Sequence, residues 1–446
     1  MGNLIELDQK HFIHPTSSIK QQQKYGPKAI MEHGQGIYLT DIHGKKYMDG
    51  MSSLWNVNIG HGRKELVDAA AEQMKKLAFS STFSTFSNIP AIKLAEKIAQ
   101  ISPENLNAVF LTSGGSESND TAFKLARHYW KIKGMSERKK IISLKRGYHG
   151  VAAGATSATG ISAFWKMAGH LMTDFHHVKS PYQESTKEAI LSLEKMIKEE
   201  GPDTIAAFIA EPVQGAGGVL IPPQDYFFEI RKLCDKYNIL FIADEVITGF
   251  GRTGKMFGLE HWGVLPDMMT FAKGVSSGYV PLGGVVISDH IHEILKEKSE
   301  GVLFHGFTYS GHPTAAAVGL KNIEIIEQES LVEHARQMGE KLYYGFLNIK
   351  QNMKIVGNVR TLGLLGAVEI VKNPVTHERF SKEVGATAKV IEALHDRGVI
   401  CRGVTYDGTD IICFAPPLVI NEKQLNDMLE KLQDALSFVQ NKLHYT

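Results

Sequence analysis

Two ionisable residues follow two short apolar runs in the middle of the chain. The run 240–243 is followed by Asp244, and the run 268–272 is followed by Lys273. Short, uninterrupted apolar runs are typical of strands that are buried on both faces of a parallel sheet. Open α/β sheets bind ligands beyond the carboxyl ends of such strands. We therefore expect one carboxylate and one amine to face the same crevice.

This pair has the chemistry that pyridoxal phosphate requires. A lysine amine can bind the cofactor aldehyde covalently, while a carboxylate beside the pyridine nitrogen keeps that ring protonated and able to accept electrons. The opposite charge of the carboxylate favours the charged pyridinium in a site of low dielectric. A strand-end Asp followed by a Lys is more often a helix cap and a solvated side chain, so the pair alone does not establish a site.

The residues around the pair resemble the signature of the class III aminotransferases, which have the type I fold of pyridoxal-phosphate enzymes. The matching stretches are 244–254, Asp-Glu-Val-Ile-Thr-Gly-Phe-Gly-Arg-Thr-Gly, and 270–274, Thr-Phe-Ala-Lys-Gly. The resemblance implies that Lys273 carries the cofactor and that Asp244 contacts its pyridine nitrogen. It also implies that Val246 packs under the cofactor ring.

A loop for the cofactor phosphate is predicted where the apolar run 109–112 leads through 113–118 into a helical stretch that starts at Asn119. A turn of small residues before a helix offers free backbone N–H groups and the positive end of the helix dipole to an anion. Any strand-to-helix turn with a serine cap looks similar, but the resemblance assigns Gly115 and Ser116 to the phosphate. The loop has neither the Rossmann nor the Walker spacing, which counts against a nucleotide ligand.

Two further cofactor contacts follow from the same resemblance. Tyr148, in Gly-Tyr-His-Gly, is expected to stack on the pyridine ring. The adjacent His149 is kept only as a possible neighbour, because a lone histidine is usually structural. Glu211 follows the apolar run 205–210 and is expected near the cofactor, with a capped turn as the alternative.

A motif further along the chain implies a second subunit. The segment 305–313, His-Gly-Phe-Thr-Tyr-Ser-Gly-His-Pro, is similar to one in the omega-amino acid:pyruvate branch of the family. In that branch the threonine, here Thr308, reaches the phosphate of the neighbouring subunit's cofactor. The resemblance therefore implies a homodimer whose active sites lie at the interface.

Two residues are candidates for substrate contacts. Trp55 lies in the glycine-rich segment 50–62, and Arg402 lies in 398–403. Without the resemblance, the simplest interpretation is that Trp55 caps the core and that Arg402 forms a surface ion pair. In the same family branch, this tryptophan lines the substrate pocket with Tyr148, and this arginine binds the substrate carboxylate. A guanidinium suits that role because its planar fork can donate two parallel hydrogen bonds.

The 446 residues, 43% of them hydrophobic, can bury a large core. The resemblance implies an α/β protein of fold type I, with a mostly parallel seven-stranded sheet in a large cofactor-binding domain at 61–328. A smaller α/β domain should combine an N-terminal segment, 1–60, with a C-terminal unit, 329–446. Within the N-terminal segment, alternation around a turn predicts a hairpin over 36–49.

Several local predictions concern the surroundings of the site. Helical spacing predicts a helix over 64–77 that packs through one apolar face, made of Leu66, Val67, Ala70, Met74 and Leu77. Phe83 and Phe86 either close the core or line a pocket or a dimer contact. In the C-terminal unit we expect helices over 382–397 and 422–442.

Charge and cysteine content exclude several classes of protein. Lys plus Arg number 49 and Asp plus Glu number 48, so nothing favours binding to nucleic acid or to an anionic membrane. Three scattered cysteines suit neither a disulfide framework nor a zinc site, and no metal is expected. No secretory signal or membrane-spanning run is recognised, so we expect a cytoplasmic protein.

The expected reaction is a ping-pong transamination from an amine donor, such as an omega-amino acid, to a keto acid acceptor such as pyruvate. The alternative is the biotin-pathway enzyme that aminates 8-amino-7-oxononanoate from S-adenosylmethionine. The transamination to pyruvate is favoured by the pair Leu54-Trp55 and by the segment 305–313. An aminomutase on the same fold would need no keto acid. A cofactor-binding regulator would need a DNA-binding module, for which no segment is spare. The motifs leave open the physiological amine, the stereochemistry, dimer against tetramer, and whether Arg402 moves.

Overall fold

The computed structural model describes residues 3–182 and 184–443, and a seven-stranded sheet lies at its centre. Its strands are β4 (Leu106–Thr112), β5 (Lys140–Leu144), β6 (Phe175–Val178), β7 (Ile205–Ala210), β8 (Leu240–Asp244), β9 (Met268–Phe271) and β10 (Gly283–Ser288). Their order is β4-β10-β9-β8-β7-β5-β6. β10 runs antiparallel to β4 and β9, whereas β9, β8, β7, β5 and β6 pair in parallel. The predicted α/β class and the mostly parallel seven-stranded sheet are confirmed.

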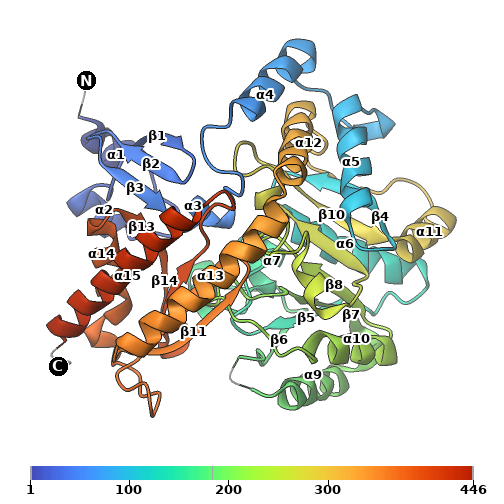
Figure 1. Cartoon of the computed structure of the whole chain (residues 1–446). Helices are drawn as coiled ribbons and strands as arrows, with labels where there is room; N and C mark the ends of the chain where they lie inside the picture. Colours follow the sequence, from blue (N-terminus) through green and yellow to red (C-terminus); the bar gives the residue numbers. More distant parts are fainter. Residues whose placement is uncertain (1–2, 183, 444–446) are drawn as a thin grey trace.

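Helices cover both faces of this sheet (Figure 1). They include α6 (Gly115–Ile132), α7 (Ala153–Ala158), α9 (Thr186–Glu200), α10 (Tyr226–Tyr237) and α11 (Asp289–Lys298). Phe208 and Phe241 pack toward α9 and α10, while their neighbours Ile209 and Ile242 pack toward α6. Successive side chains of a strand point to opposite faces, which explains why β7 and β8 are buried throughout and read as unbroken apolar runs.

Two smaller sheets lie beside the large one. The first contains β1 (Met31–Gln35), β2 (Tyr38–Asp41), β3 (Lys46–Asp49) and β13 (Val399–Ile400); the second contains β11 (Val356–Leu362), β12 (Leu365–Ile370), β14 (Arg402–Val404) and β15 (Asp410–Phe414). Because β13 pairs in parallel with β3, the two ends of the chain share a sheet, as the neighbouring blue and red elements of Figure 1 show. The predicted hairpin forms as β2 and β3. The boundaries 1–60, 61–328 and 329–446 stay a prediction.

The remaining helices lie along the whole described chain, and two of those in its C-terminal part differ from the sequence prediction. They are α1 (Leu4–His11), α2 (Ile19–Tyr25), α3 (Ser52–Trp55), α4 (Lys64–Leu77), α5 (Ile89–Ile101), α8 (Ser162–Ala168), α12 (Pro313–Gln328), α13 (Leu331–Asn352), α14 (Ala386–Asp396) and α15 (Glu422–Lys442), with short 3-10 helices η1 (Phe83–Thr85), η2 (Pro202–Thr204), η3 (Gly258–Trp262), η4 (Lys273–Val275), η5 (Lys382–Val384) and η6 (Tyr406–Gly408). The predicted helix 382–397 is wrong in extent, because Gly385 at φ 60° separates η5 from α14. The long helix α13 was not predicted, although its buried residues recur at helical spacing.

The apolar face of α4 does not pack as predicted. The helix has the expected bounds, but within this chain Leu66 is its buried residue, while Val67 is 58% and Met74 54% exposed. Phe83 and Phe86 are also exposed, at 50% and 72%, so they do not close the core. No helix in the described ranges is both long and apolar enough to span a bilayer.

Candidate active site

A cavity of about 180 Å³ lies at the carboxyl ends of β7, β8 and β9. The predicted site residues that line it are Trp55, Gly115, Ser116, Tyr148, Glu211, Asp244, Val246, Lys273 and Arg402. Strand β7 ends just before Glu211, β8 ends at Asp244, and β9 ends just before Ala272 and Lys273. The structure therefore brings together every predicted site residue except Thr308, which is exposed and is not part of the lining.

Asp244 is held in place by a set of hydrogen bonds. Its Oδ2 accepts a bond of 2.8 Å from Asn119 Nδ2 and lies 2.7 Å from His149 Nδ1. Its Oδ1 accepts the backbone N–H of Val246 at 3.1 Å. Thr270 holds the Asn119 amide in turn, by donating to its oxygen at 2.8 Å. The carboxylate is 2% exposed, so these donors fix its direction and offset the cost of burying it.

Lys273 is half-buried, lines the same cavity and has a left-handed backbone conformation, with φ 49°. Burial lowers the pKa of its amine from 10.5 to about 8, although the negative charges of Asp244 and Glu211 oppose this change. Removal from water disfavours the ammonium form, which is the dominant physical cause. The neutral fraction of this amine near neutral pH is therefore far larger than that of an ordinary lysine, and the neutral form is the one that nucleophilic attack requires.

The predicted phosphate loop has the geometry of an anion site. Helix α6 begins at Gly115, four residues before the predicted start, so the loop residues themselves form its first turn. The N–H groups of a first turn have no acceptor within their helix. Gly115 lies close to the Val246 side chain: a Cβ placed on it would be 2.9 Å from Cγ1. Ser116 Oγ, beside it, accepts the N–H of Val151 at 3.0 Å.

Glu211 and Tyr148 are linked through the backbone. The Glu211 carboxylate accepts N–H groups from Tyr148 at 2.8 Å and from Gly215 at 3.0 Å. Burial raises the pKa of Glu211 to about 7. Burial also raises the pKa of the Tyr148 phenol, whose ring centroid lies 5.3 Å from that of Phe164.

Two of the predicted substrate residues, Trp55 and Arg402, contact each other. The Arg402 guanidinium carbon lies 5.0 Å from the centroid of the Trp55 ring, and Lys273 Nζ lies 5.6 Å from the same ring. Trp55 is 2% exposed, and Arg402 is half-buried in β14 beside Cys413 of β15. Cations are attracted to the face of an indole, so Trp55 forms a platform between the two basic groups.

Sequence reasoning missed several lining residues. Asn119 lies one helical turn after Ser116 in α6. A polar residue at that spacing lies on the same face of the helix as Ser116, so the sequence could have predicted that it lines the cavity. His149, kept only as a possible neighbour, contacts Asp244 directly. Thr16 and Phe164 also line the cavity, but they come from distant segments in which no pattern marks them.

The residues present fit pyridoxal phosphate. The helix N-terminus and the serine hydroxyl match the phosphate of that group. The buried carboxylate matches its ring nitrogen, and the lysine amine with the lowered pKa matches its aldehyde. Within 3–182 and 184–443, no group of three or more His, Cys, Asp and Glu residues could hold a metal ion.

Comparison with known proteins agrees with this chemistry. The family model for class III aminotransferases matches residues 20–436. A putrescine–pyruvate aminotransferase of Pseudomonas aeruginosa is 41% identical over 434 residues, which cover 95% of this chain and 93% of that protein. A transaminase from the marine bacterium Virgibacillus has 66% identity, a TM-score of 0.98 and 99% coverage of both chains. An omega transaminase from Pseudomonas jessenii, solved with PMP, has 38% identity, a TM-score of 0.95 and 99% coverage of both chains.

Proposed function

This chain belongs to the class III aminotransferase family, and we propose that it moves amino groups from omega-amino acids or other amines to pyruvate in the cavity around Lys273. The observation that carries the proposal is the meeting of Asp244, Lys273 and Arg402 in one cavity. The family depends on pyridoxal phosphate, which supplies an electron sink for the bonds broken at the amine carbon.

Several residues of the cavity have a role in this scheme. Gly115 and Ser116 would bind the cofactor phosphate at the start of α6, and Asp244 would stabilise positive charge on the ring nitrogen. Tyr148 would stack on the ring, and Val246 would pack against it. Lys273 Nζ would bind the aldehyde covalently at rest. Once the donor amine has displaced it, the free Nζ would take the proton from the donor carbon and pass it to the carbon that carried the aldehyde. Glu211 supports this arrangement through the backbone of Tyr148.

Arg402 is proposed to bind the substrate carboxylate, so Arg402→Gln should raise the KM for pyruvate about tenfold or more. Charge-assisted hydrogen bonds contribute about 1.5–3 kcal/mol, and glutamine cannot replace the charge. The KM for an amine donor without a carboxylate should change little. Initial-rate kinetics with each substrate varied separately measure both values. Arg397→Gln, which breaks an exposed ion pair with Asp434, is the matched control. Equal effects of the two variants would contradict the assignment.

The lowered pKa of Lys273 predicts a pH profile for binding of pyridoxal phosphate to the cofactor-free protein. The neutral amine reacts, and its fraction grows as the pH rises to the pKa of about 8. The binding rate, followed by stopped-flow absorbance, should therefore rise with pH and level off near this value. In Asp244→Asn, loss of a negative charge that raises the pKa of Lys273 should move the profile to lower pH. A rate that keeps rising to the ordinary lysine value of 10.5 would contradict this prediction.

We also propose a homodimer with active sites at its interface. In support, Val67, Met74 and Leu77 of α4 are exposed in the single chain together with Phe83 and Phe86, and so is Phe304, at 94%. Apolar surface of this extent is typical of subunit interfaces. Thr308, four residues after Phe304, is also exposed, in keeping with its proposed contact to the partner's cofactor phosphate.

A subunit-mixing experiment tests this dimer. Lys273→Ala and Thr308→Asp chains should each be inactive, the second because its carboxylate repels the phosphate. After mixing and exchange, a hybrid dimer has one site with an intact Lys273 from one chain and an intact Thr308 from the other. Activity should therefore return, and light scattering should give a mass of at least two chains. Monomers, or no recovery after verified exchange, would contradict the shared site.

We further propose a cytoplasmic location. Cys234, Cys401 and Cys413 are all free thiols, which suits a reducing compartment. Cell fractionation with an antibody to the protein would test the location.

The substrate assignment is tested by product formation. With putrescine or another omega-amine and pyruvate, the holoenzyme should form alanine, and the reaction should require the keto acid. Turnover without any keto acid would indicate an aminomutase. Activity confined to S-adenosylmethionine with 8-amino-7-oxononanoate would move the assignment to biotin synthesis and overturn the proposal.

A further inference from the structure

The segment that carries Trp55 has an unusual backbone. Ser52, Ser53 and Trp55 have positive φ values of 46°, 55° and 58°. Side chains with a Cβ rarely adopt this region, because the Cβ approaches the backbone too closely. Such conformations persist where surrounding contacts fix them, and they occur often at functional sites.

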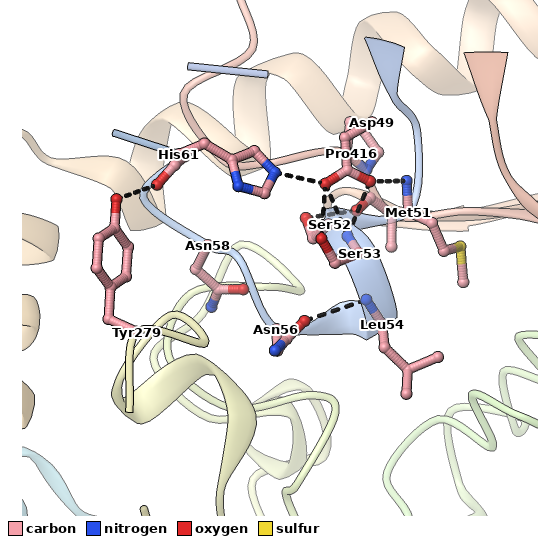
Figure 2. Close-up of polar contacts among 12 residues, drawn as sticks. Asp49, Met51, Ser52, Ser53, Leu54, Asn56, Asn58, His61, Tyr279 and Pro416 are labelled. Carbon is pink, nitrogen blue, oxygen red and sulfur yellow. Dashed lines mark hydrogen bonds and ion pairs between the residues drawn. The ribbon is translucent and has the colours of Figure 1, made fainter. Parts of the chain in front are cut away.

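The first group of contacts centres on Asp49 (Figure 2). Its fully buried carboxylate accepts the N–H of Met51 at 3.2 Å and the N–H of Ser53 at 2.7 and 2.8 Å. His61 Nε2 lies 2.8 Å from the same carboxylate. Asp49 thus binds the backbone on both sides of the first left-handed residue, Ser52.

The second group centres on Arg252, which is also fully buried. One guanidinium nitrogen donates to Ser52 Oγ at 2.8 Å and to Asn58 Oδ1 at 2.8 Å, and the other donates to the carbonyl of Pro416. Burial lowers the pKa of this guanidinium, and the negative charge of Asp49 opposes that change. The planar fork can therefore tie the two ends of the Trp55 segment to the chain that follows β15.

The same contacts lead to the catalytic cavity. Asn58 donates to the carbonyl of Phe250 at 2.9 Å and packs against the residue after Lys273, since a Cβ on Gly274 would lie 2.6 Å from Asn58 Nδ2. At the other end of the segment, Trp55 lies beneath the Arg402 guanidinium. The pair Asp49 and Arg252 is thus connected both to the lysine segment and to the indole.

We propose that Asp49 and Arg252 are positioning residues that hold the strained segment 51–58, and through it the Trp55 platform on which Arg402 rests. Neither side chain lines the cavity; they act through the backbone that presents Trp55. The proposal rests on the proposed function, in which Trp55 and Arg402 form the substrate pocket. It adds that recognition of the substrate carboxylate depends on a buried acid and a buried base behind this pocket.

Asp49→Asn tests the proposal, with Asp41→Asn as its matched control. Asp41 is a buried acid on the neighbouring strand that accepts the N–H groups of His43 and Lys45 at 2.9 and 3.0 Å, away from the cavity. Both variants replace an acceptor of backbone N–H groups by an amide. In the holoenzyme, Asp49→Asn should raise the KM for pyruvate about tenfold with little change in kcat, because misplaced binding groups weaken substrate positioning. Asp41→Asn should lower the melting temperature and leave the KM unchanged.

Tryptophan fluorescence gives a readout that does not depend on activity. The emission spectrum of Trp55 is obtained by subtracting the spectrum of the counterpart with Trp55→Phe from the spectrum of each protein. It should move to longer wavelength in Asp49→Asn, as the indole becomes wetter, and stay unchanged in Asp41→Asn. Arg252→Lys keeps the charge but not the fork, so it should show the same shift, and it serves as the second variant if Asp49→Asn does not fold.

Equal KM values and equal Trp55 emission in Asp49→Asn and Asp41→Asn would overturn the proposal. Trp55→Phe separates its failure from that of the proposed function. If Trp55→Phe leaves the KM for pyruvate unchanged, the substrate role of Trp55 is wrong; the positioning role is then judged by the emission shift alone.

Discussion

Lys273→Ala should abolish transamination, lowering kcat by about 10⁴-fold or more. Alanine removes both the covalent attachment of the cofactor and the group that moves the proton, and proton transfer alone contributes about 10²–10⁴-fold. Initial rates of alanine formation from an amine and pyruvate measure the loss. The visible absorption of the lysine-bound cofactor should disappear in the same variant.

Lys255→Ala is the matched control, because Lys255 directly follows the signature stretch 244–254 and is exposed. It should retain normal kcat and normal absorption. Added methylamine should restore part of the rate to Lys273→Ala, since a small free amine can accept the proton that Nζ no longer takes. Lys273→Ala with more than a tenth of normal kcat would contradict the assigned role.

Asp244→Asn should lower kcat by about 10²–10³-fold, the usual effect of removing one preorganised electrostatic group from a buried site. The amide has nearly the same shape but carries no charge to stabilise the protonated ring nitrogen. In the unchanged protein, Asn119 Nδ2 and the His149 ring point at an oxygen of Asp244, which accepts hydrogen bonds. The NH₂ group of the asparagine would face one of them and cannot accept. The measurement is kcat with saturating amine and pyruvate.

Asp267→Asn controls for loss of a partly buried carboxylate next to the same strand. Asp267 Oδ2 accepts the N–H of Phe241 at 2.7 Å and a hydrogen bond from Arg231 at 2.8 Å, at the end of β8 remote from the cavity. This variant should melt at a lower temperature with unchanged kcat. The role of Asp244 is refuted if both variants lower kcat equally.

The strand ends of the site could be predicted from the sequence because their signal is local. The runs before Glu211, Asp244 and Lys273 are buried on both faces, so every residue except Thr270 is apolar until the strand reaches the cavity. A polar residue at that point stands out. The parallel sheet then brings these ends together without further information.

Other parts of the site depend on contacts between distant segments, which no local pattern contains. Thr16 reaches the cavity from the chain before α2, and Trp55 adopts a left-handed conformation because Asp49 and Arg252 hold its neighbours. The predicted apolar face of α4 is largely exposed in this chain, because apolar periodicity does not show whether other elements of the same chain cover a helix face. For the same reason the packing prediction for α4 was wrong although its bounds were right.

We expect Lys273 to carry the cofactor in this cavity. Reduction of the holoenzyme with borohydride, followed by peptide mass spectrometry, tests this attachment directly, because reduction makes the link to lysine permanent. The cofactor mass should appear on the peptide that contains Lys273, and no label should appear once an excess of amine donor has freed that lysine. A label on any other lysine, or none on the untreated holoenzyme, would show that Lys273 does not carry the cofactor.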